Sequence, residues 1–408
     1  MKNIRNKLIL IISFILAATL IIIAMVINDN SKVTQPVTNT EPVTEAPTEF
    51  ETVLPTLADA SENDKDISTK LTEYAGRMNF SGSVYLVDKG EVILDFAQGD
   101  YSGKGSDIKY GVASVTKQIT AASVMQLFED GKLDLDDKLS QYFPKYSIGK
   151  DITVRQLLCQ RSGIPDYSIE YSDDAAWAYT DNSTYMVMVK KENTSQLNRN
   201  IIKDLVFDCE LLFEPGEEFY YSDSNYALLA DIVEQVSGES FHDYVRENIF
   251  EPLGMTAAFI DDYSYGYDVT VAGTDRFEFD DDYFKYKGLE FGCGDMLAST
   301  GDLYKWYKGL TNAKVVSKST YAQMIENYSS PEELGYGYGL MISDEVDCKT
   351  LFHYGFIPSY YSSIFMIPEH DVFAAVLANH EKGYPQTAAC NIVKNYAKAS
   401  GYEIINIE

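Results

Sequence analysis

A serine and a lysine three residues apart, Ser114 and Lys117, have the types and spacing that could carry chemistry. They stand at the predicted start of a helix, where residues i and i+3 share a face. A buried lysine beside a serine can lose its proton and activate the hydroxyl as a nucleophile. The helix N-terminus would stabilise the developing oxyanion. A helix N-cap is the alternative for Ser114 alone. The same spacing at Ser147 and Lys150 falls in a loop with no helix behind it, which favours a chance match.

Two later segments hold residues that could assist such a nucleophile. Tyr221–Asp223 precedes a predicted helix, and a tyrosine held near a lysine can pass protons. Tyr220 is the weaker alternative in this register, and with 31 tyrosines in the chain a structural role is the competing interpretation. His353–Gly355 lies on a predicted late strand, where the glycine would let a ligand approach the backbone. A lone histidine, however, is more often structural than catalytic.

The elements that must position these residues form an α+β pattern. Apolar and aromatic runs bounded by turn residues predict strands at 82–87, 91–96, 336–342, 350–354, 360–367 and 372–378. Periodicity and capping signals predict helices at 112–128, 153–163, 195–207, 225–236, 240–252 and 386–399, with Pro252 stopping the fifth. Strands thus stand at both ends and helices in the middle. We predict an antiparallel sheet built from N- and C-terminal strands, flanked by helices, with a mostly helical inserted region.

The N-terminus predicts export. Residues 8–27 carry no charge and as a helix would span about 30 Å, the thickness of a bilayer's hydrocarbon core. The basic residues precede this run, which orients the N-terminus toward the cytoplasm. We predict a cytoplasmic segment at 1–7, a transmembrane anchor at 8–27, a Thr-, Pro- and Glu-rich linker at 28–66 and a catalytic domain at 67–408. A cleaved signal peptide is the alternative, and it also exports the domain.

Composition excludes several classes of function. The net charge of −29 repels phosphate backbones, so we expect no nucleic-acid partner. Five cysteines without a CxxC pair and four histidines without an HExxH motif indicate neither a disulfide scaffold nor a transition-metal enzyme. We therefore expect no metal and no cofactor. The sequence does not indicate an oligomeric state.

Taken together, the three motifs resemble those of the serine β-lactamase and penicillin-binding protein superfamily, which include SxxK and KTG. The most similar branch is that of class C β-lactamases and their carboxypeptidase and esterase relatives. The resemblance covers roughly residues 70–400 beyond the motifs. The matching segments are 111–122, 153–158, 162–165, 219–255 and 297–303.

The resemblance implies a role for each motif residue. Ser114 would be the acylated nucleophile and Lys117 its proton acceptor or relay. Tyr221 would act as general base and acid, and His353 would stand where the third motif usually has lysine. The backbone N–H groups of Ser114 and Phe356, the residue after Gly355, would form the oxyanion hole. No cofactor is needed for this cycle of acylation and hydrolysis.

Two positions depart from the family pattern. The second motif usually ends in asparagine, and here it ends in Asp223, which as a carboxylate offers no donor to a substrate amide. An ionised Asp223 near Lys117 would also favour the charged lysine, so we expect Tyr221 to carry more of the base role. His353, neutral or half-charged near pH 7, would hold a substrate carboxylate less firmly than lysine does.

The sequence therefore predicts a membrane-anchored, extracytoplasmic serine hydrolase, on a surface of the Gram-positive type. The expected substrates are D-amino-acid peptides of the cell wall or small esters. A non-catalytic protein that binds cell-wall peptides or β-lactams is one alternative; retention of all three motif positions counts against it, and Asp223 keeps it open. A true class C β-lactamase is the other, and the anchor and His353 count against it.

Overall fold

The computed structural model describes residues 81–98, 105–166, 210–260, 290–331, 333–344, 348–357 and 360–379, with single residues at 69, 203, 206, 207 and 396. The predicted anchor, the linker, most of the 195–207 helix and all but one residue of the 386–399 helix lie outside them. Among the described residues, no helix has both the length and the apolar character needed to cross a bilayer.

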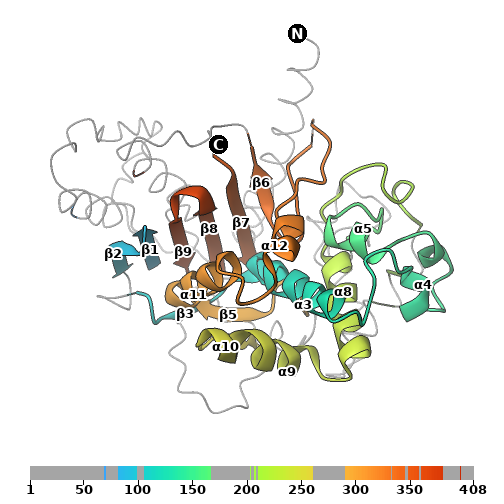
Figure 1. Cartoon of the computed structure of the whole chain (residues 1–408), viewed down its shortest axis with the longest axis horizontal. Helices are drawn as coiled ribbons and strands as arrows, with labels where there is room; N and C mark the ends of the chain where they lie inside the picture. Colours follow the sequence, from blue (N-terminus) through green and yellow to red (C-terminus); the bar gives the residue numbers. More distant parts are fainter. Residues whose placement is uncertain are drawn as a thin grey trace, which may run out of the picture.

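The centre of the fold is a six-stranded antiparallel sheet in the order β2-β1-β9-β8-β7-β6 (Figure 1). Its strands are β1 (Gly82–Asp88), β2 (Glu91–Gln98), β6 (Met341–Ser343), β7 (Thr350–Ile357), β8 (Tyr360–Ile367) and β9 (Val372–Ala378). The register pairs Gly82 with Ala378, so the first and last described strands lie side by side. The predicted sheet from both ends of the domain is confirmed.

A second, three-stranded sheet has the order β3-β5-β4, formed by Lys109–Gly111, Met296–Ser299 and Ala258–Phe259. The longer helices are α3 (Lys117–Glu129), α8 (Asp223–Ser237) and α11 (Thr300–Thr311). The shorter ones are α4 (Leu139–Tyr142), α5 (Val154–Leu158), α9 (Phe241–Val245), α10 (Glu251–Leu253) and α12 (Lys318–Met324). Single turns are η2 (Ala113–Thr116), η3 (Ser147–Lys150), η4 (Arg246–Phe250) and η7 (Pro368–His370).

Helix α3 lies in the middle of the molecule. It follows η2, which contacts β7 and β8, and it packs against α8 on another side. Its side chains from Lys117 to Met125 are all buried, as expected for a helix enclosed by other elements on every side. Helix α11 contacts β9 and β1, while α4, α5 and α8 gather beyond β6, away from β2 (Figure 1). The lysine of the first motif therefore starts a helix whose first nine side chains are all buried.

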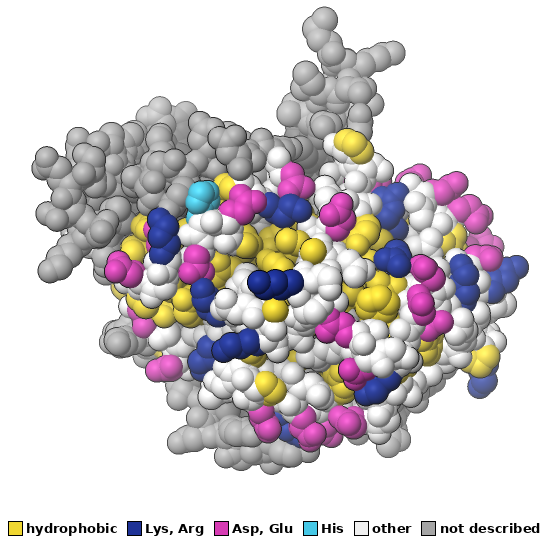
Figure 2. All heavy atoms as spheres, viewed as in Figure 1, with side chains coloured by type: hydrophobic (Ala, Val, Ile, Leu, Met, Phe, Trp, Pro, Cys, Tyr) yellow, Lys and Arg dark blue, Asp and Glu magenta, His cyan; other side chains and the backbone are white. Residues whose placement is uncertain are grey.

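Local signals account for several element boundaries. Thr153 and Gln156 form the predicted capping box of α5, and Gly238 ends α8 in the left-handed conformation with φ of +79°. Ser240 caps α9 as predicted, its Oγ accepting from the backbone N–H of Asp243 at 3.1 Å. On the face drawn in Figure 2, basic and acidic side chains are interspersed rather than separated into patches.

Two boundaries predicted from the sequence are wrong. Pro252 does not stop the helical path, which continues through η4, a π-helical turn, and α10 until Gly254 ends it. Proline cannot donate to the carbonyl of Asn248, and that carbonyl accepts instead from Gln126 Nε2 at 3.4 Å. The strand predicted at 336–342 is reduced to β6, with a single bridge between Tyr336 and Met341.

Candidate active site

The first motif occupies the junction between η2 and α3. Lys117 Nζ lies 3.0 Å from the Oγ of half-buried Ser114. No side chain caps η2 or α3, so Ser114 is not the N-cap that was the alternative. Ala113, just before it, has a φ of +48°, an uncommon conformation that persists where the surroundings impose it. In the other SxxK segment, the Lys150 side chain is 73 % exposed and pairs with Asp151.

Lys117 is fully buried and meets three acceptors. Besides Ser114 Oγ, its Nζ donates to the backbone oxygen of Cys293 at 2.9 Å and lies 2.6 Å from Asp223 Oδ1. Burial is the largest single influence and lowers the pKa of the Lys117 ammonium, but the Asp223 carboxylate and the neighbouring Tyr221, Cys293 and Tyr336 together outweigh it, and the net pKa lies well above that of an ordinary lysine. An ammonium has three N–H donors, which matches the three acceptors. The resting lysine is therefore charged.

Tyr221 lies beside this ammonium, whose nitrogen is 5.0 Å from the centre of the ring. Its hydroxyl is buried and makes no hydrogen bond within the described part of the chain. Burial raises the pKa of Tyr221 well above its usual value, although the charge of Lys117 acts in the opposite direction. The phenol is neutral at rest. It is Tyr221 rather than Tyr220 whose ring faces the lysine, in keeping with the preferred register.

His353 is buried on β7 and held at both ring nitrogens. Nδ1 lies 2.6 Å from the Tyr354 carbonyl oxygen, and Nε2 lies 3.4 Å from Tyr336 Oη. The carbonyl can only accept, so Nδ1 carries the proton and Nε2 accepts from the tyrosine. Burial, aided by the charge of Lys117, lowers the pKa of His353 to about 3. The third motif thus presents a neutral imidazole at neutral pH.

Gly355 lets β7 approach the nucleophile turn. A Cβ at this position would lie 2.3 Å from the Val112 carbonyl oxygen and 2.4 Å from Ser362 Oγ, which are themselves hydrogen-bonded at 2.6 Å. No other residue fits without displacing η2. Phe356 alternates to the other face of the strand from His353, and its side chain is 43 % exposed. The oxyanion role of the Phe356 N–H stays a prediction.

Sequence reasoning missed two contributors. Tyr336 contacts His353 and stacks edge-on against Tyr221, with ring centres 6.0 Å apart; its place between Gly335 and Gly337 was a signal of close packing. The Cys293 carbonyl is a backbone atom, for which no side-chain pattern exists. The structure therefore brings together every predicted motif residue and adds one phenol and one carbonyl.

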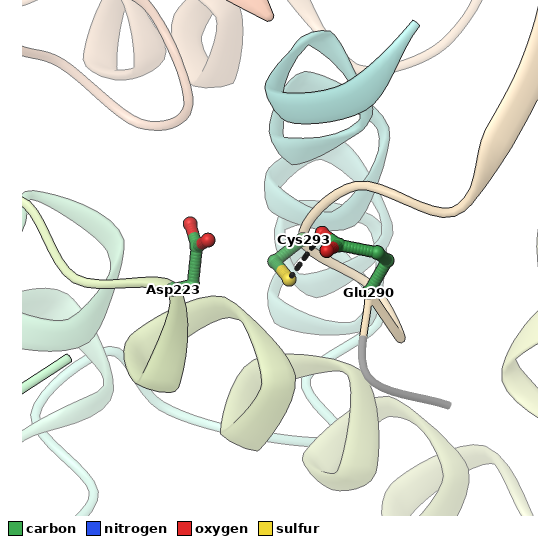
Figure 3. Close-up of side chains that lie close together, drawn as sticks. All are labelled: Asp223, Glu290 and Cys293. Atoms are coloured by element: carbon green, nitrogen blue, oxygen red, sulfur yellow. Dashed lines mark hydrogen bonds between the residues drawn. The ribbon is translucent and has the colours of Figure 1, made fainter. Parts of the chain in front are cut away.

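Asp223, Glu290 and Cys293 place their ligand atoms within 4.8 Å of one another. Figure 3 shows Glu290 and Cys293 joined by a contact of 3.9 Å, with Asp223 extending from the first turn of α8. Such atoms could in principle hold a cation. The Lys117 ammonium, however, already neutralises Asp223 at 2.6 Å. We therefore interpret this carboxylate as the partner of the lysine.

Comparisons with known proteins agree with this arrangement. A family model described as Beta-lactamase matches residues 73–397. Protein flp of Staphylococcus aureus is 30% identical over 322 residues, covering 74% of this chain and 60% of the relative, so the chain spans only about three fifths of that protein. Penicillin-binding protein 4* of Bacillus subtilis is 26% identical over 341 residues, or 78% of this chain and 72% of the relative.

Two solved structures are similar in fold. An octameric penicillin-binding protein homologue from Pyrococcus abyssi has a TM-score of 0.64 and 29% identity, over 83% of this chain and 77% of its own. A D-amino acid amidase from Ochrobactrum anthropi SV3 has a TM-score of 0.66 and 22% identity, over 83% of this chain and 99% of its own. At that identity, the amidase shows the shared fold alone.

Proposed function

Because the chain belongs to the Beta-lactamase family and is a serine hydrolase related to penicillin-binding proteins, we propose that it acts outside the cytoplasm on D-amino-acid peptides or esters. The observation that carries the proposal is the 3.0 Å contact between Lys117 Nζ and Ser114 Oγ at the start of a buried helix. In this cycle Ser114 Oγ attacks the substrate carbonyl, the leaving group departs protonated, and water hydrolyses the acyl-enzyme.

The charge on Lys117 decides which group takes the serine proton. An ammonium has no lone pair, so the resting lysine orients Ser114 and stabilises negative charge rather than acting as the base. Tyr221 is the group left for proton transfer, because its buried hydroxyl has no other described partner. The neighbouring ammonium makes its phenolate less costly. Tyr221 therefore acts as a relay: its oxygen accepts the proton of Ser114 while its own hydroxyl proton passes to the leaving group, so the phenol is neutral before and after the step.

The neutral third motif bears on the substrate. A substrate carboxylate placed beside His353 would meet an uncharged, fully buried imidazole instead of a lysine. Recognition by charge is therefore weak at His353, and the carboxylate of a β-lactam gains little binding energy there. We expect slow nitrocefin hydrolysis compared with hydrolysis of an ester of a D-amino acid. Efficient nitrocefin turnover would overturn this interpretation and favour a true β-lactamase.

The location rests on residues outside the described part of the chain. The uncharged run at 8–27 after three basic residues supports a membrane anchor with the domain exported. The Pro- and Thr-rich residues 28–66 would hold the domain away from the bilayer. Fractionation of cells, followed by protease treatment of intact cells, tests this directly, since a cytoplasmic domain would be protected.

The nucleophile is tested by intact mass measurement of the full chain in detergent after treatment with a fluorophosphonate or, separately, a penicillin. Ser114→Ala is the matched variant. A stoichiometric adduct that the variant lacks supports the proposal. Labelling by penicillin points to peptidoglycan peptides, and labelling by the phosphonate alone points to esters. A folded protein that takes neither label contradicts catalysis and favours the binding protein, the alternative that Asp223 keeps open.

A further inference from the structure

The backbone carbonyl that binds Lys117 belongs to a tight turn at 290–294. The N–H groups of Cys293 and Gly294 both donate to the Glu290 carbonyl, at 3.0 and 2.8 Å. Gly292 has a φ of +68°, and a Cβ there would lie 2.3 Å from Ala230 Cβ of α8. The turn is therefore wedged between α8 and α3, and its exact position sets where the Cys293 oxygen meets the lysine.

Side chains from two other elements hold this turn. Thr120 Oγ1 of α3 donates to the Gly292 carbonyl at 2.6 Å, on the same helix as Lys117. On the other side, the Gly292 N–H donates to Asp295 Oδ1 at 3.1 Å. Asp295 is only 5 % exposed. A buried carboxylate needs a partner for each oxygen, since an unsatisfied one is costly.

The second oxygen of Asp295 is bound by a histidine from α9. His242 Nε2 lies 2.8 Å from Asp295 Oδ2, and the His242 side chain is 15 % exposed. Its ring stacks on Phe259 of β4, with centres 3.9 Å apart and planes 8° apart. The imidazole is thus fixed by stacking on one face and by the carboxylate at its edge. None of the contacts described for Ser114, Tyr221 or His353 involves this pair.

We propose that His242 and Asp295 are positioning residues for the catalytic lysine, acting through the Gly292–Cys293 backbone. The inference rests on the proposed function of Ser114 and Lys117. His242 orients Asp295, Asp295 fixes the Gly292 N–H, and the carbonyl of Cys293, two peptide units further along the same turn, is thereby held where it accepts a hydrogen bond from Lys117. Without this support the carbonyl turns away from Nζ. The ammonium is then left with two acceptors and no fixed direction toward Ser114 Oγ.

The test uses variants that keep or remove the hydrogen bond. His242→Phe preserves stacking on Phe259 but has no N–H, whereas His242→Gln keeps a donor. For His242→Phe, we expect kcat for an ester substrate to fall about 10- to 100-fold, because small misplacements of catalytic groups cost rates of this order, with KM within about 2-fold. His242→Gln should recover most of the loss. Asp295→Asn, which still offers an oxygen to Gly292, should behave like His242→Gln.

A control on the same helix separates stability from positioning. Asp243 bonds Ser240 and pairs with Arg246 at the surface, so Asp243→Ala should lower the melting temperature without changing kcat. The rate of fluorophosphonate labelling at Ser114 is the second readout. If the wild type is labelled and His242→Phe is labelled equally fast, the positioning role is refuted. If the folded wild type is not labelled, the proposed function itself is refuted. Should His242→Phe fail to fold, equal labelling of Asp295→Ala and wild type refutes the role.

Discussion

Replacing Asp223 by asparagine should move the base role from Tyr221 to Lys117. At 2.6 Å and an effective dielectric constant of about 20, Coulomb's law gives roughly 6 kcal/mol for the attraction between the carboxylate and the ammonium. The asparagine oxygen keeps a hydrogen bond from a charged donor worth about 1.5–3 kcal/mol. The charged form of Lys117 then loses roughly 3–4 kcal/mol of stabilisation. Because Asp223 is 20 % exposed, screening by solvent makes the actual loss smaller than this figure.

With that stabilisation removed, the influence of burial on the pKa of Lys117, already the largest single one, is opposed much less. Burial lowers the pKa of Lys117, so in Asp223→Asn the neutral amine is populated at lower pH and can take the serine proton itself. In the wild type, Tyr221→Phe should slow acylation about 10²- to 10⁴-fold, the range for a general base. In the Asp223→Asn background, Tyr221→Phe should slow acylation by less than about 10-fold.

The assay is the rate of fluorophosphonate adduct formation at Ser114, followed by intact mass between pH 5 and 9. The four proteins of the cycle are compared below their melting temperatures, because removing one partner of a buried pair also costs stability. Asp371→Asn, which breaks the remote ion pair with Lys308, is the matched control and should leave the rate unchanged. If Tyr221→Phe slows adduct formation by the same factor in both backgrounds, the division of roles between lysine and tyrosine is refuted.

Two further predictions concern His353 and Gly355. The folded-state pKa of His353 is about 3 against an ordinary 6.5, so the unfolded chain binds the proton first and stability falls as pH drops below about 6.5. At pH 4.5 the free energy of unfolding should be roughly 3 kcal/mol lower than at neutral pH because of His353 alone. Urea unfolding should show this loss in the wild type and not in His353→Gln. Parallel pH profiles of stability for the two proteins would contradict the assignment. Gly355→Ala should slow fluorophosphonate labelling of Ser114 more than about 10-fold and lower the melting temperature. The new Cβ would lie 2.3 Å from the Val112 oxygen, and overpacking of this kind costs about 1–3 kcal/mol of stability. An unchanged labelling rate would contradict the prediction, because it would show that η2 tolerates displacement.

Local patterns predicted most of the sheet. The hairpin of β1 and β2, with its turn at 88–90, and strands β7 to β9 follow from apolar runs bounded by turn residues. The segment 336–340 looked like a strand by the same criteria. There, Gly339 adopts a φ of +76° because its backbone packs against the Lys117 carbonyl, 2.6 Å from where a Cβ would be. Tertiary packing overrides local preference at that point.

The site divides in a similar way. Ser114, Lys117 and Tyr221 could be predicted because their side chains form recognisable spacings. The charge on Lys117 was expected from Asp223, and the 2.6 Å contact supplies the reason. The burial that makes His353 neutral depends on the whole fold, and the carbonyl of Cys293 has no sequence signal. Spacing therefore identified the chemistry, while protonation states required the three-dimensional surroundings.

The pairing of β1 with β9 has a consequence for how the chain folds. Gly82 meets Ala378, so the pairing closes a loop that contains nearly the whole domain. Contacts so distant along the chain form slowly, because their loop-closure entropy precedes any gain. During synthesis the β1–β2 hairpin stays without its neighbour until β9 has emerged. Its exposed edge is then open to pairing with other chains. Folding of the sheet is therefore a late, all-or-none event, and a chain truncated before residue 372 should aggregate rather than accumulate as a folded fragment.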